Sequence, residues 1–462
     1  MVAIVWFRND LRLADHLALD ATIKTGNPVL PLFIYDKNHP RLLGEASKWW
    51  LHHSLTSLKN NLNKLEADLI LRQGNAFKVL KDIATKIPIS HIFWHRRYGQ
   101  EGIQQDIEIK SHFKELGVIC HSFNGSLLFE PYTIKNKEGK PFKVFSAFWR
   151  HCLGQNSPGR PIPAPDRLIF DPQFKGISDT QESLGLLPHP NWAKGLEDSW
   201  EPGEENAQKT LEIFLADHLK NYKKNRDYPV MKTSRLSPYI RWGEISVRQL
   251  WHATNQSGIF DGHDADSECF LSELGWREFA HHTLFHNPDL AQEPLRKDFK
   301  KFPWEQDQKL FDAWTKGLTG YPIVDAGMRE LWTTGYMHNR VRMITASFLI
   351  KHLLQPWQKG EQWFWDTLVD ADVASNPFNW QWVAGCGADA APYFRIFNPT
   401  LQGEKFDPKG EYIKHWVPEL RDFPNEFIHT PWLYKGRPSS YPSPLVNHQK
   451  AREKALRAFK EM

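Results

Sequence analysis

Cysteine is scarce in this chain of 462 residues. Four are present, Cys120, Cys152, Cys269 and Cys386, and no two of them have CxxC spacing. The wide spacing argues against a zinc site, an iron–sulfur cluster and a disulfide framework. We therefore expect no metal site, and a protein that resides in the reducing cytoplasm.

Long hydrophobic runs are also missing. Charged residues appear at Arg8 and Asp10, before the core of a signal peptide could form. No stretch of about 18 consecutive apolar residues occurs, so we expect no membrane segment. The net charge of +4 is too small to indicate a nucleic-acid partner by itself, although it permits a local basic patch.

A nucleotide-binding loop of the GxGxxG type is absent too. Five short apolar runs within residues 1–125 predict strands buried on both faces, at 3–7, 29–35, 69–71, 91–94 and 118–123. Helical spacing lies between them, and this alternation predicts a doubly wound parallel sheet in a Rossmann-like α/β domain. The first run is followed by RNDLRLADH, so a cofactor here would bind in some other way.

Beyond residue 125 the strand pattern fades. Residues 126–200 are rich in proline, glycine and polar side chains, and we expect a long surface connector there. Residues 201–462 show helical apolar spacing, as in 268–286 and 341–357. With 41% hydrophobic and 24% charged residues the chain can bury sizeable cores. The second domain is therefore predicted to be larger and all-α.

Two motifs of this second domain suit ligand binding. KTSRLSPY at 232–239 places hydroxyls and an arginine before a helical stretch, where free backbone amides could bind a diphosphate, although most such clusters only cap helices. DADVASNPFNWQW at 370–382 brings two acids, an amide and two indoles together. The 20 tryptophans of the chain are mostly expected in packed cores.

Two further motifs read as helices. ELGWREF at 273–279 and MHNRVRM at 337–343 mix polar and large apolar residues at helical spacing. In the second motif Asn339 and Met343 are four residues apart and share a face. Arg340 and Arg342 are expected to point elsewhere.

Taken in order, these motifs resemble the photolyase and cryptochrome family. The resemblance extends to WFRNDLRLADHLAL at the start and PYFRIFNPTLQGEKFD near the end, and so covers essentially the whole chain. It is most like a class I photolyase for cyclobutane pyrimidine dimers (CPD). It implies an α/β domain at 1–125 that can carry an antenna pigment, the connector at 126–200, and an all-α domain at 201–462 that holds FAD in a U-shaped conformation.

The resemblance also assigns the flavin site by motif position. Asp370 and Asp372 would lie at the flavin ring, and buried Asp370 needs an ion-pair partner, for which Arg342 is the candidate. Asn376 would face flavin N5, where a neutral amide suits an anionic reduced flavin as electron donor. The implied FAD-binding residues are Tyr222, Thr233, Ser234, Arg235, Leu236, Ser237, Phe270, Arg342, Asp370, Asp372 and Asn376.

The same resemblance implies a light-driven reaction on DNA. Reduced FAD would pass an electron to a pyrimidine dimer flipped out of DNA. Glu273 would stabilise the lesion, while Trp276, Met343 and Trp382 form its apolar walls. An electron relay would run from Trp380 through Trp357 to Trp304 at the surface. The implied DNA-binding residues are Arg226, Glu273, Trp276, Asn339, Arg340, Met343 and Trp382, and further phosphate contacts are expected from Lys223, Lys224, Lys405 and the run 296–301.

Three residues indicate the branch of the family: Asn376, Asn339 and Met343. Asn339 and Met343 stand where animal-type (6-4) photolyases have the histidines needed for proton transfer, so the resemblance favours CPD repair. The rival interpretations are a cryptochrome photoreceptor without repair activity and a light-independent flavoprotein. An antenna folate, a deazaflavin or no antenna all stay open, with Glu101 the one candidate residue. Cryptochrome receptors often carry a long C-terminal tail, whereas this chain ends soon after a closing helix, which favours repair. We expect a monomer with no obligate protein partner.

Overall fold

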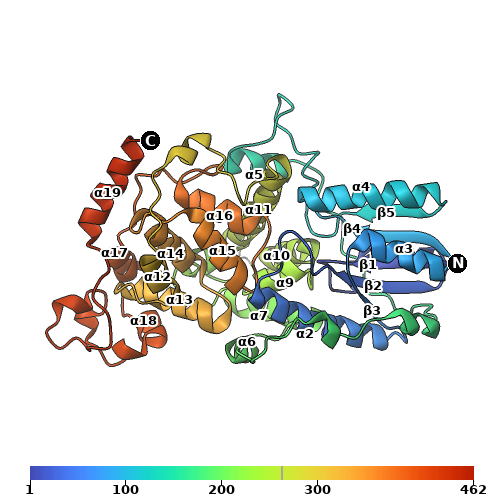
Figure 1. The fold of residues 1–462 in the computed structure, drawn as a ribbon, viewed down its shortest axis with the longest axis horizontal. Helices are drawn as coiled ribbons and strands as arrows, with labels where there is room; N and C mark the ends of the chain where they lie inside the picture. Colours follow the sequence, from blue (N-terminus) through green and yellow to red (C-terminus); the bar gives the residue numbers. More distant parts are fainter. Residues whose placement is uncertain (262–263) are drawn as a thin grey trace. The chain divides into compact units, whose positions relative to one another are not determined.

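The computed structural model of the protein describes residues 1–261 and 264–462, and the chain forms two compact units (Figure 1). The first unit comprises Met1–Pro141, Ala147–Lys220 and Ser234–Pro288. The second comprises Phe142–Ser146, Asn221–Thr233 and Asp289–Met462. The domain boundaries expected near residues 125 and 200 stay a prediction.

The first unit contains one parallel sheet of five strands. The strands lie in the order β3 (Ile70–Gln73), β2 (Val29–Tyr35), β1 (Val2–Phe7), β4 (Ile89–His95) and β5 (Ile119–Phe123). The chain builds outward from β1 to β3 and then crosses over to β4 and β5, so the topological switch point lies between β1 and β4. The strands are joined by α1 (Leu17–Lys24), α2 (Glu45–Asn63), α3 (Ala76–Lys86) and α4 (Gln100–Glu115). The predicted doubly wound sheet is confirmed.

The two edges of this sheet differ. At β3, the Leu71 N–H donates to Ser178 Oγ (3.0 Å) and the Leu71 carbonyl accepts from the Asp179 N–H (2.7 Å), so a segment of the predicted connector covers this edge. At the other edge the expectation of burial on both faces was wrong for β5, since Ile119 is 57% exposed. An edge strand has one neighbour instead of two, and its apolar residues did not reveal that position.

The predicted connector carries short helices. They are α5 (Phe145–Leu153), η1 (Pro172–Ile177), η2 (Glu182–Leu184) and α6 (Lys194–Ser199). The remaining helices of the first unit are α7 (Glu204–Ile213), η3 (Phe214–His218), α9 (Ser237–Trp242), α10 (Val247–Asp261) and α11 (Asp264–His286), of which α10 and α11 pack together. Leu250 and Phe279 on this helical pair are fully buried.

The described part of the second unit contains helices and no strands. Its longer helices are α12 (Gln308–Thr315), α13 (Pro322–Thr334), α14 (Asn339–Lys351), α15 (Trp357–Thr367), α16 (Ser375–Ala384), α17 (Pro399–Phe406) and α19 (His448–Lys460). Shorter ones are α8 (Tyr222–Asn225), η4 (Lys297–Lys301), α18 (Glu411–Trp416), η5 (Pro418–Leu420), η6 (Asn425–Phe427) and η7 (Pro431–Leu433). Pro322 opens α13 and Gly335, with φ +64°, ends it, as the residue types favour. The prediction of a mostly helical second half is confirmed.

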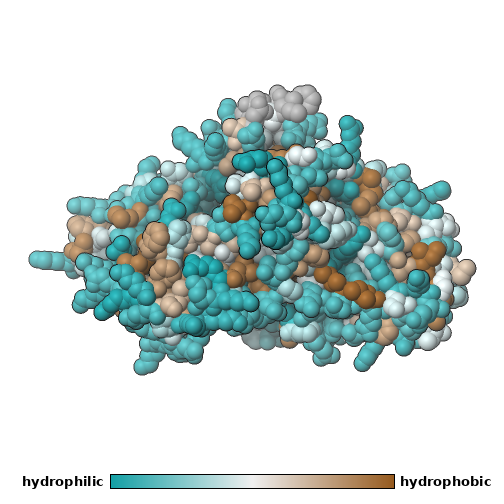
Figure 2. All heavy atoms as spheres, turned by 90° about the horizontal axis from the view of Figure 1, so that it is seen from above, coloured by the Kyte–Doolittle hydropathy of each residue, from teal (hydrophilic) through white to brown (hydrophobic). Residues whose placement is uncertain are grey.

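The core of the second unit lies around α13 to α16. Phe348 and Leu349 on α14 are fully buried, and Trp314 and Trp357 pack into the same core. Within the described residues, no helix is sufficiently long and apolar to span a bilayer. The face drawn in Figure 2 is mostly hydrophilic, with hydrophobic residues in small scattered groups.

Candidate functional site

The RNDLRLADH motif follows β1 at the switch point, where open α/β sheets usually bind ligands. Arg12 of the motif is buried, and its guanidinium donates to the main-chain oxygens of Gly243 (2.8 Å), Asp15 (2.9 Å) and Gly125 (3.0 Å). All of these partners belong to the first unit. Arg12 therefore binds the protein's own backbone and not a phosphate.

Two carboxylates, Asp15 of the motif and Glu204 outside it, also hold the motif in place. The Asp15 carboxylate accepts from Arg248 Nη2 (2.6 Å) and from Ser246 Oγ (2.5 Å). The Leu13 and Ala14 N–H groups donate to the Glu204 carboxylate at 2.7 and 2.8 Å. These bonds join the loop after β1 to residues about 200 positions later, so they stabilise the fold of the first unit.

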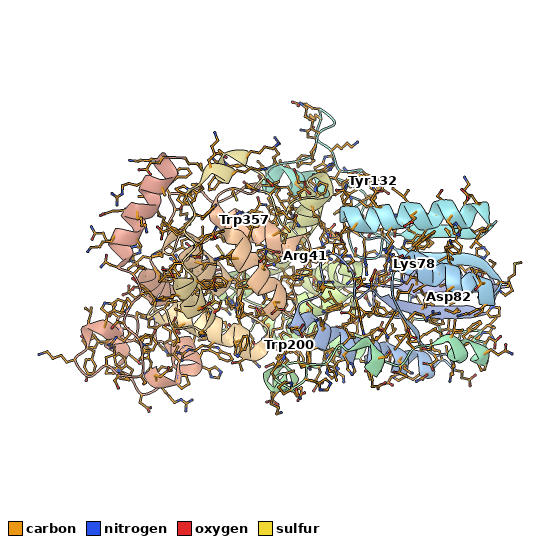
Figure 3. All side chains as sticks on the ribbon, viewed as in Figure 1. Arg41, Lys78, Asp82, Tyr132, Trp200 and Trp357 are labelled. Carbon is orange, nitrogen blue, oxygen red and sulfur yellow. The ribbon has the colours of Figure 1, made fainter. Side chains whose placement is uncertain are left out.

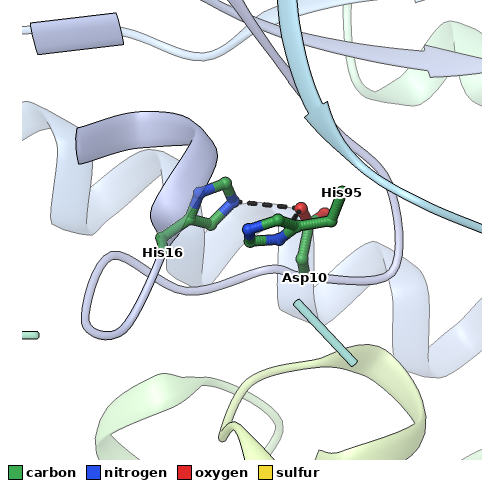
Figure 4. Close-up of side chains that lie close together, drawn as sticks. All are labelled: Asp10, His16 and His95. Atoms are coloured by element: carbon green, nitrogen blue, oxygen red, sulfur yellow. Dashed lines mark ion pairs between the residues drawn. The ribbon is translucent and has the colours of Figure 1, made fainter. Parts of the chain in front are cut away.

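Asp10, His16 and His95 form a buried cluster at the same switch point (Figure 4). Asp10 Oδ2 lies 3.0 Å from His16 Nε2 and 2.8 Å from His95 Nδ1. Among the described residues, these three are the one group with metal-ligand side chains close together. Their residue types alone would permit a cation site.

The hydrogen bonds of the cluster do not fit a metal ion. The Leu19 N–H donates to His16 Nδ1 (3.0 Å) and the Ala18 N–H to His95 Nε2 (3.4 Å). A ring nitrogen that accepts a hydrogen bond carries no proton, so each neutral ring keeps its proton on the nitrogen facing Asp10. Burial lowers the pKa of His95 to about 3, which keeps that ring neutral. A metal would have to replace both protons, and we assign the cluster to the scaffold.

The predicted antenna region shows one contact. Glu101 lies in the first turn of α4, and its Oε2 is 3.2 Å from His39 Nε2. Both side chains are substantially exposed. A folate or deazaflavin antenna stays a prediction.

Five of the predicted FAD-binding residues lie in the first unit: Ser234, Arg235, Leu236, Ser237 and Phe270. Ser234 Oγ accepts from the N–H of Leu236, which precedes α9. Arg235 has a positive φ of 50°, and its guanidinium lies 4.0 Å from the Trp200 ring. Phe270 is buried with its ring 4.6 Å from that of Phe214.

The ELGWREF motif lies on α11 of the first unit. Arg277 Nη1 donates to the Ser126 carbonyl (2.7 Å), and Glu278 Oε2 accepts the Leu128 N–H (2.9 Å) and the Phe129 N–H (3.1 Å). Burial raises the pKa of Glu278 to about 7, against the opposing effect of Arg277. These two residues therefore anchor the loop at 126–129. Glu273 and Trp276, three apart on the helix and partly exposed, are the members that can meet a ligand.

The remaining predicted FAD-binding residues lie in the second unit: Tyr222, Thr233, Arg342, Asp370, Asp372 and Asn376. Arg342 Nη2 lies 2.8 Å from Asp370 Oδ2, so the predicted ion pair is confirmed. Arg342 Nε also donates to the Met337 carbonyl (2.7 Å). Arg342 is thus fixed at the start of α14, and Asp370 lies between α15 and α16.

Asp372 and Asn376 organise the start of α16. Asp372 Oδ1 accepts the N–H groups of Ala374 (2.9 Å) and Ser375 (2.8 Å) and so fixes the turn that leads into the helix. Buried Asn376 donates from Nδ2 to the main-chain oxygen and to Oε1 of Glu361, both at 2.9 Å. Because both amide hydrogens face Glu361, Oδ1 is the atom that Asn376 offers to a ligand, as an acceptor.

Arg340 differs from its expected direction. It was predicted to point away from the face of Asn339 and Met343, but its Nη1 lies 3.8 Å from Met343 Sδ. The reason is a second set of contacts: Nη2 lies 2.7 Å from Asp227 Oδ1, and the guanidinium lies 4.5 Å from the Phe406 ring. These partners draw the side chain along the helix toward Met343. Asn339 is exposed at the start of α14.

Gln381 separates the two indoles of the NWQW sequence. Its Nε2 donates to the carbonyls of Leu290 (2.7 Å) and Glu293 (2.8 Å), and its Oε1 accepts the Leu295 N–H (2.9 Å). The glutamine therefore locks α16 to the loop at 290–295. Trp380 is buried and Trp382 partly exposed, as the helical offset of two residues predicts for opposite faces.

Trp380 begins a chain of aromatic contacts that the sequence did not single out. Its ring centroid lies 6.2 Å from that of Trp314, and Trp314 lies 5.8 Å from Phe311. Phe311 lies 6.5 Å from Trp363, which stacks on Trp332 at 5.9 Å. Trp332 is 67% exposed, so this series of aromatic contacts reaches the surface. The unusual tryptophan content was the one signal in the sequence for it.

The two other predicted relay members lie in the same unit. Trp357, labelled in Figure 3, is buried at the start of α15. Trp304 is partly buried, with its ring 4.2 Å from that of Phe302. Trp304 is less buried than Trp380 and Trp357, which agrees with a position nearer the surface. The relay itself stays a prediction.

Comparison with known proteins gives matches over the whole chain. Residues 3–166 match the family model described as DNA photolyase, and residues 270–461 match the model described as FAD binding domain of DNA photolyase. The chain is 47% identical to a deoxyribodipyrimidine photo-lyase of Agrobacterium fabrum, over 99% of this chain and 97% of that protein. It is 36% identical to Cryptochrome-1 of Arabidopsis thaliana, over 100% of this chain and 70% of that protein.

A solved structure is similar to the whole fold. The crystal structure of a bacterial class III photolyase from Agrobacterium tumefaciens superposes with a TM-score of 0.96 at 46% identity. The superposition covers 100% of this chain and 98% of the other. The similarity to class I suggested by the motifs stays a prediction, since this neighbour belongs to class III.

Proposed function

Since this chain belongs to the photolyase and cryptochrome family, we propose that it repairs cyclobutane pyrimidine dimers in DNA with light energy. The chain carries the FAD-binding domain of DNA photolyase in residues 270–461, and FAD is its cofactor. When bound in its reduced form, FAD supplies the electron that opens the cyclobutane ring of the lesion. The protein's own residues bind, orient and shield the reacting groups.

The observation that carries the proposal is the orientation of the Asn376 amide. Its Nδ2 is held by Glu361, and Oδ1 is left as an acceptor in a buried position. An acceptor beside flavin N5 favours a flavin that carries a proton there, as reduced flavin does. This supports a repair enzyme that works from reduced FAD.

The ion pair of Arg342 and Asp370 has a complementary role. The Asp370 side chain is only 4% exposed, so its charge needs the neighbouring guanidinium. In our proposal this fixed pair orders the edge of the flavin site, and Asp372 orders the start of α16. Tyr222, Thr233, Ser234, Arg235, Leu236, Ser237 and Phe270 would complete the binding site.

The lesion would meet residues of α11, α14 and α16. Glu273 would accept hydrogen bonds from the lesion bases, and Trp276, Met343 and Trp382 would supply apolar contact. Asn339 and Met343 offer no imidazole for proton transfer, which supports a CPD substrate over a (6-4) substrate. Phosphate contacts would come from Arg226 and from the exposed lysines Lys223, Lys224 and Lys405.

A cryptochrome photoreceptor is the second candidate. The observation that favours it is the similarity to Cryptochrome-1 of Arabidopsis thaliana, which covers 100% of this chain and 70% of that protein. Such a receptor would bind FAD and respond to light without repairing DNA. We further propose a cytoplasmic monomer that needs no obligate protein partner for repair.

One experiment separates the two functions. The reduced protein is illuminated with an oligonucleotide that contains a single CPD, and restored thymines are measured by chromatography. A (6-4) oligonucleotide and a dark sample serve as controls. We expect light-dependent repair of the CPD alone. FAD photoreduction without CPD repair would move the assignment to a photoreceptor.

A further inference from the structure

Arg340 is held by three neighbours in the second unit. Its Nη2 lies 2.7 Å from Asp227 Oδ1, its guanidinium lies 4.5 Å from the Phe406 ring, and its Nη1 lies 3.8 Å from Met343 Sδ. The side chain is 20% exposed, against 39% for Asp227. Most of the guanidinium is therefore engaged inside the protein, and the carboxylate is the more exposed partner.

This arrangement changes what Arg340 can contribute to DNA binding. A cation that neutralises a phosphate releases counterions, and this gives undamaged DNA most of its affinity for a protein. A cation already paired with a carboxylate has its charge compensated. Lys224 and Lys405 are exposed lysines of the same unit. Arg340 is thus poorly suited to serve as one more phosphate cation.

We propose that Asp227 is a specificity-determining residue: it confines Arg340 beside Met343 and withholds it from the phosphates of undamaged DNA. The proposal rests on the proposed function, because it takes the Met343 face as the lesion-binding surface. Arg340 then contributes to the pocket for a flipped lesion, and not to general adhesion to the duplex. Asp227 is a positioning residue in this scheme.

The ion pair of Asp227 and Arg340 would help the protein to select damaged DNA. A repair enzyme must find few lesions among very many undamaged sites, so the ratio of the two affinities matters more than either one. Each additional cation that contacts a phosphate strengthens the complex with damaged DNA and the complex with undamaged DNA alike, because both have the same backbone phosphates. A carboxylate that compensates one cation and repels phosphate lowers undamaged binding while leaving the contacts to the lesion in place.

The test is a charge-neutralising variant of the full-length FAD-loaded protein, Asp227→Asn. Affinity for a CPD duplex and for the identical undamaged duplex is measured over a range of salt concentrations. We expect undamaged binding to tighten about fivefold at low salt. The slope of log affinity against log salt should steepen by about 0.9, the value for one additional phosphate contact. CPD binding should change less, so the ratio of affinities falls.

Two further variants make the result specific. Asp227→Glu keeps the charge and should restore the wild-type ratio. Glu305→Gln removes an equally exposed carboxylate, 38% against 39%, from its pair with Lys454 in the same unit. It should leave the ratio unchanged. Flavin absorbance and thermal midpoint are recorded for every variant, because a misfolded protein would lose both.

Three outcomes would overturn the proposal. Unchanged undamaged binding in Asp227→Asn would show that Arg340 stays withheld without the carboxylate. Weaker binding would mean that Asp227 holds Arg340 ready for phosphate. If Glu305→Gln tightens binding to undamaged DNA as much as Asp227→Asn does, the effect arises from the change in net charge and not from Arg340. If the wild-type protein does not distinguish CPD from undamaged DNA at all, the proposed function fails, whatever the variants do.

Discussion

Asn376 gives both hydrogens of its side-chain amide to a single residue, Glu361. The two bonds, to the Glu361 main-chain oxygen and to its Oε1, are each 2.9 Å long, and both residues are buried. A backbone carbonyl and a carboxylate are both acceptors, so the amide cannot turn over without facing two acceptors with its own oxygen. Glu361 therefore decides which atom of Asn376 faces a ligand.

The first prediction concerns this orientation. In Glu361→Leu one of the two acceptors is lost, and the amide can turn its N–H toward flavin N5, which favours the oxidised flavin. Loss of one such hydrogen bond is worth about 1 kcal/mol, which corresponds to about 20 mV for a two-electron couple. We expect the flavin midpoint potential to fall by that amount in a spectroelectrochemical titration. Glu361→Gln keeps a side-chain acceptor and is the control; an equal fall in both variants would contradict the explanation.

The second prediction concerns the buried indole next to the proposed flavin site. Trp380→Phe removes the oxidisable ring while leaving an aromatic side chain of the core. We expect photoreduction of oxidised FAD to be lost, while CPD repair by chemically reduced enzyme is retained. Both are measured on the same sample, first by flavin absorbance under blue light and then by repair. Photoreduction at the wild-type rate would refute the relay.

The third prediction follows from the contacts of Trp380. Its ring also lies near Trp314, from which the aromatic chain continues to exposed Trp332. Trp357→Phe is therefore expected to slow photoreduction without abolishing it. Adding Trp314→Phe to that variant should remove most of the remaining rate. If Trp357→Phe alone is inactive in the photoreduction assay, the path through Trp314 carries no electrons.

The fourth prediction tests the scaffold role of the cluster at the switch point. A Cβ on Gly125 would lie 2.2 Å from Cγ of the His95 ring. That ring is already held by Asp10. Gly125→Ala should lower the free energy of unfolding by roughly 1–3 kcal/mol, as overpacking does. Gly176→Ala is the matched control, since nothing lies within 4 Å of its Cβ position. Thermal midpoints of the two variants compare them; equal midpoints would mean that the His95 ring yields freely.

Local pattern predicted much of this molecule. The five strands and their parallel direction follow from apolar runs that alternate with helices, and the long helices follow from their spacing. The Arg342–Asp370 pair was predicted from motif position, since a buried carboxylate needs a cation. These features depend on nearby residues or on motifs of fixed order.

Features that join distant residues could not be predicted in this way. Glu204 binds the backbone of Leu13 and Ala14, and Asp227 draws Arg340 toward Met343. Nothing in the sequence RNDLRLADH indicates that this segment forms its hydrogen bonds and ion pairs with residues about 200 positions later. The edge position of β5 was hidden for the same reason, because strand order decides it and strand composition does not.

The last prediction is a pH dependence that arises from Glu278 of the ELGWREF motif. Burial raises its pKa in the folded protein from 4.5 to about 7. Between these values the folded state holds a proton that the unfolded state has lost, so stability decreases as pH rises from about 4.5 to about 7 and stays lower above it. The full contribution is at most about 3 kcal/mol.

Glu278→Gln removes this titration while keeping an oxygen that can accept the N–H groups of Leu128 and Phe129. We therefore expect the variant to match the wild type near pH 4.5 and to be more stable than the wild type at pH 8. Thermal midpoints of both proteins, measured in steps across this range, give the difference directly. A difference that is constant with pH would show that Glu278 titrates alike in the folded and unfolded chains, and a variant less stable at pH 8 would show that its negative charge is needed by the loop at 126–129.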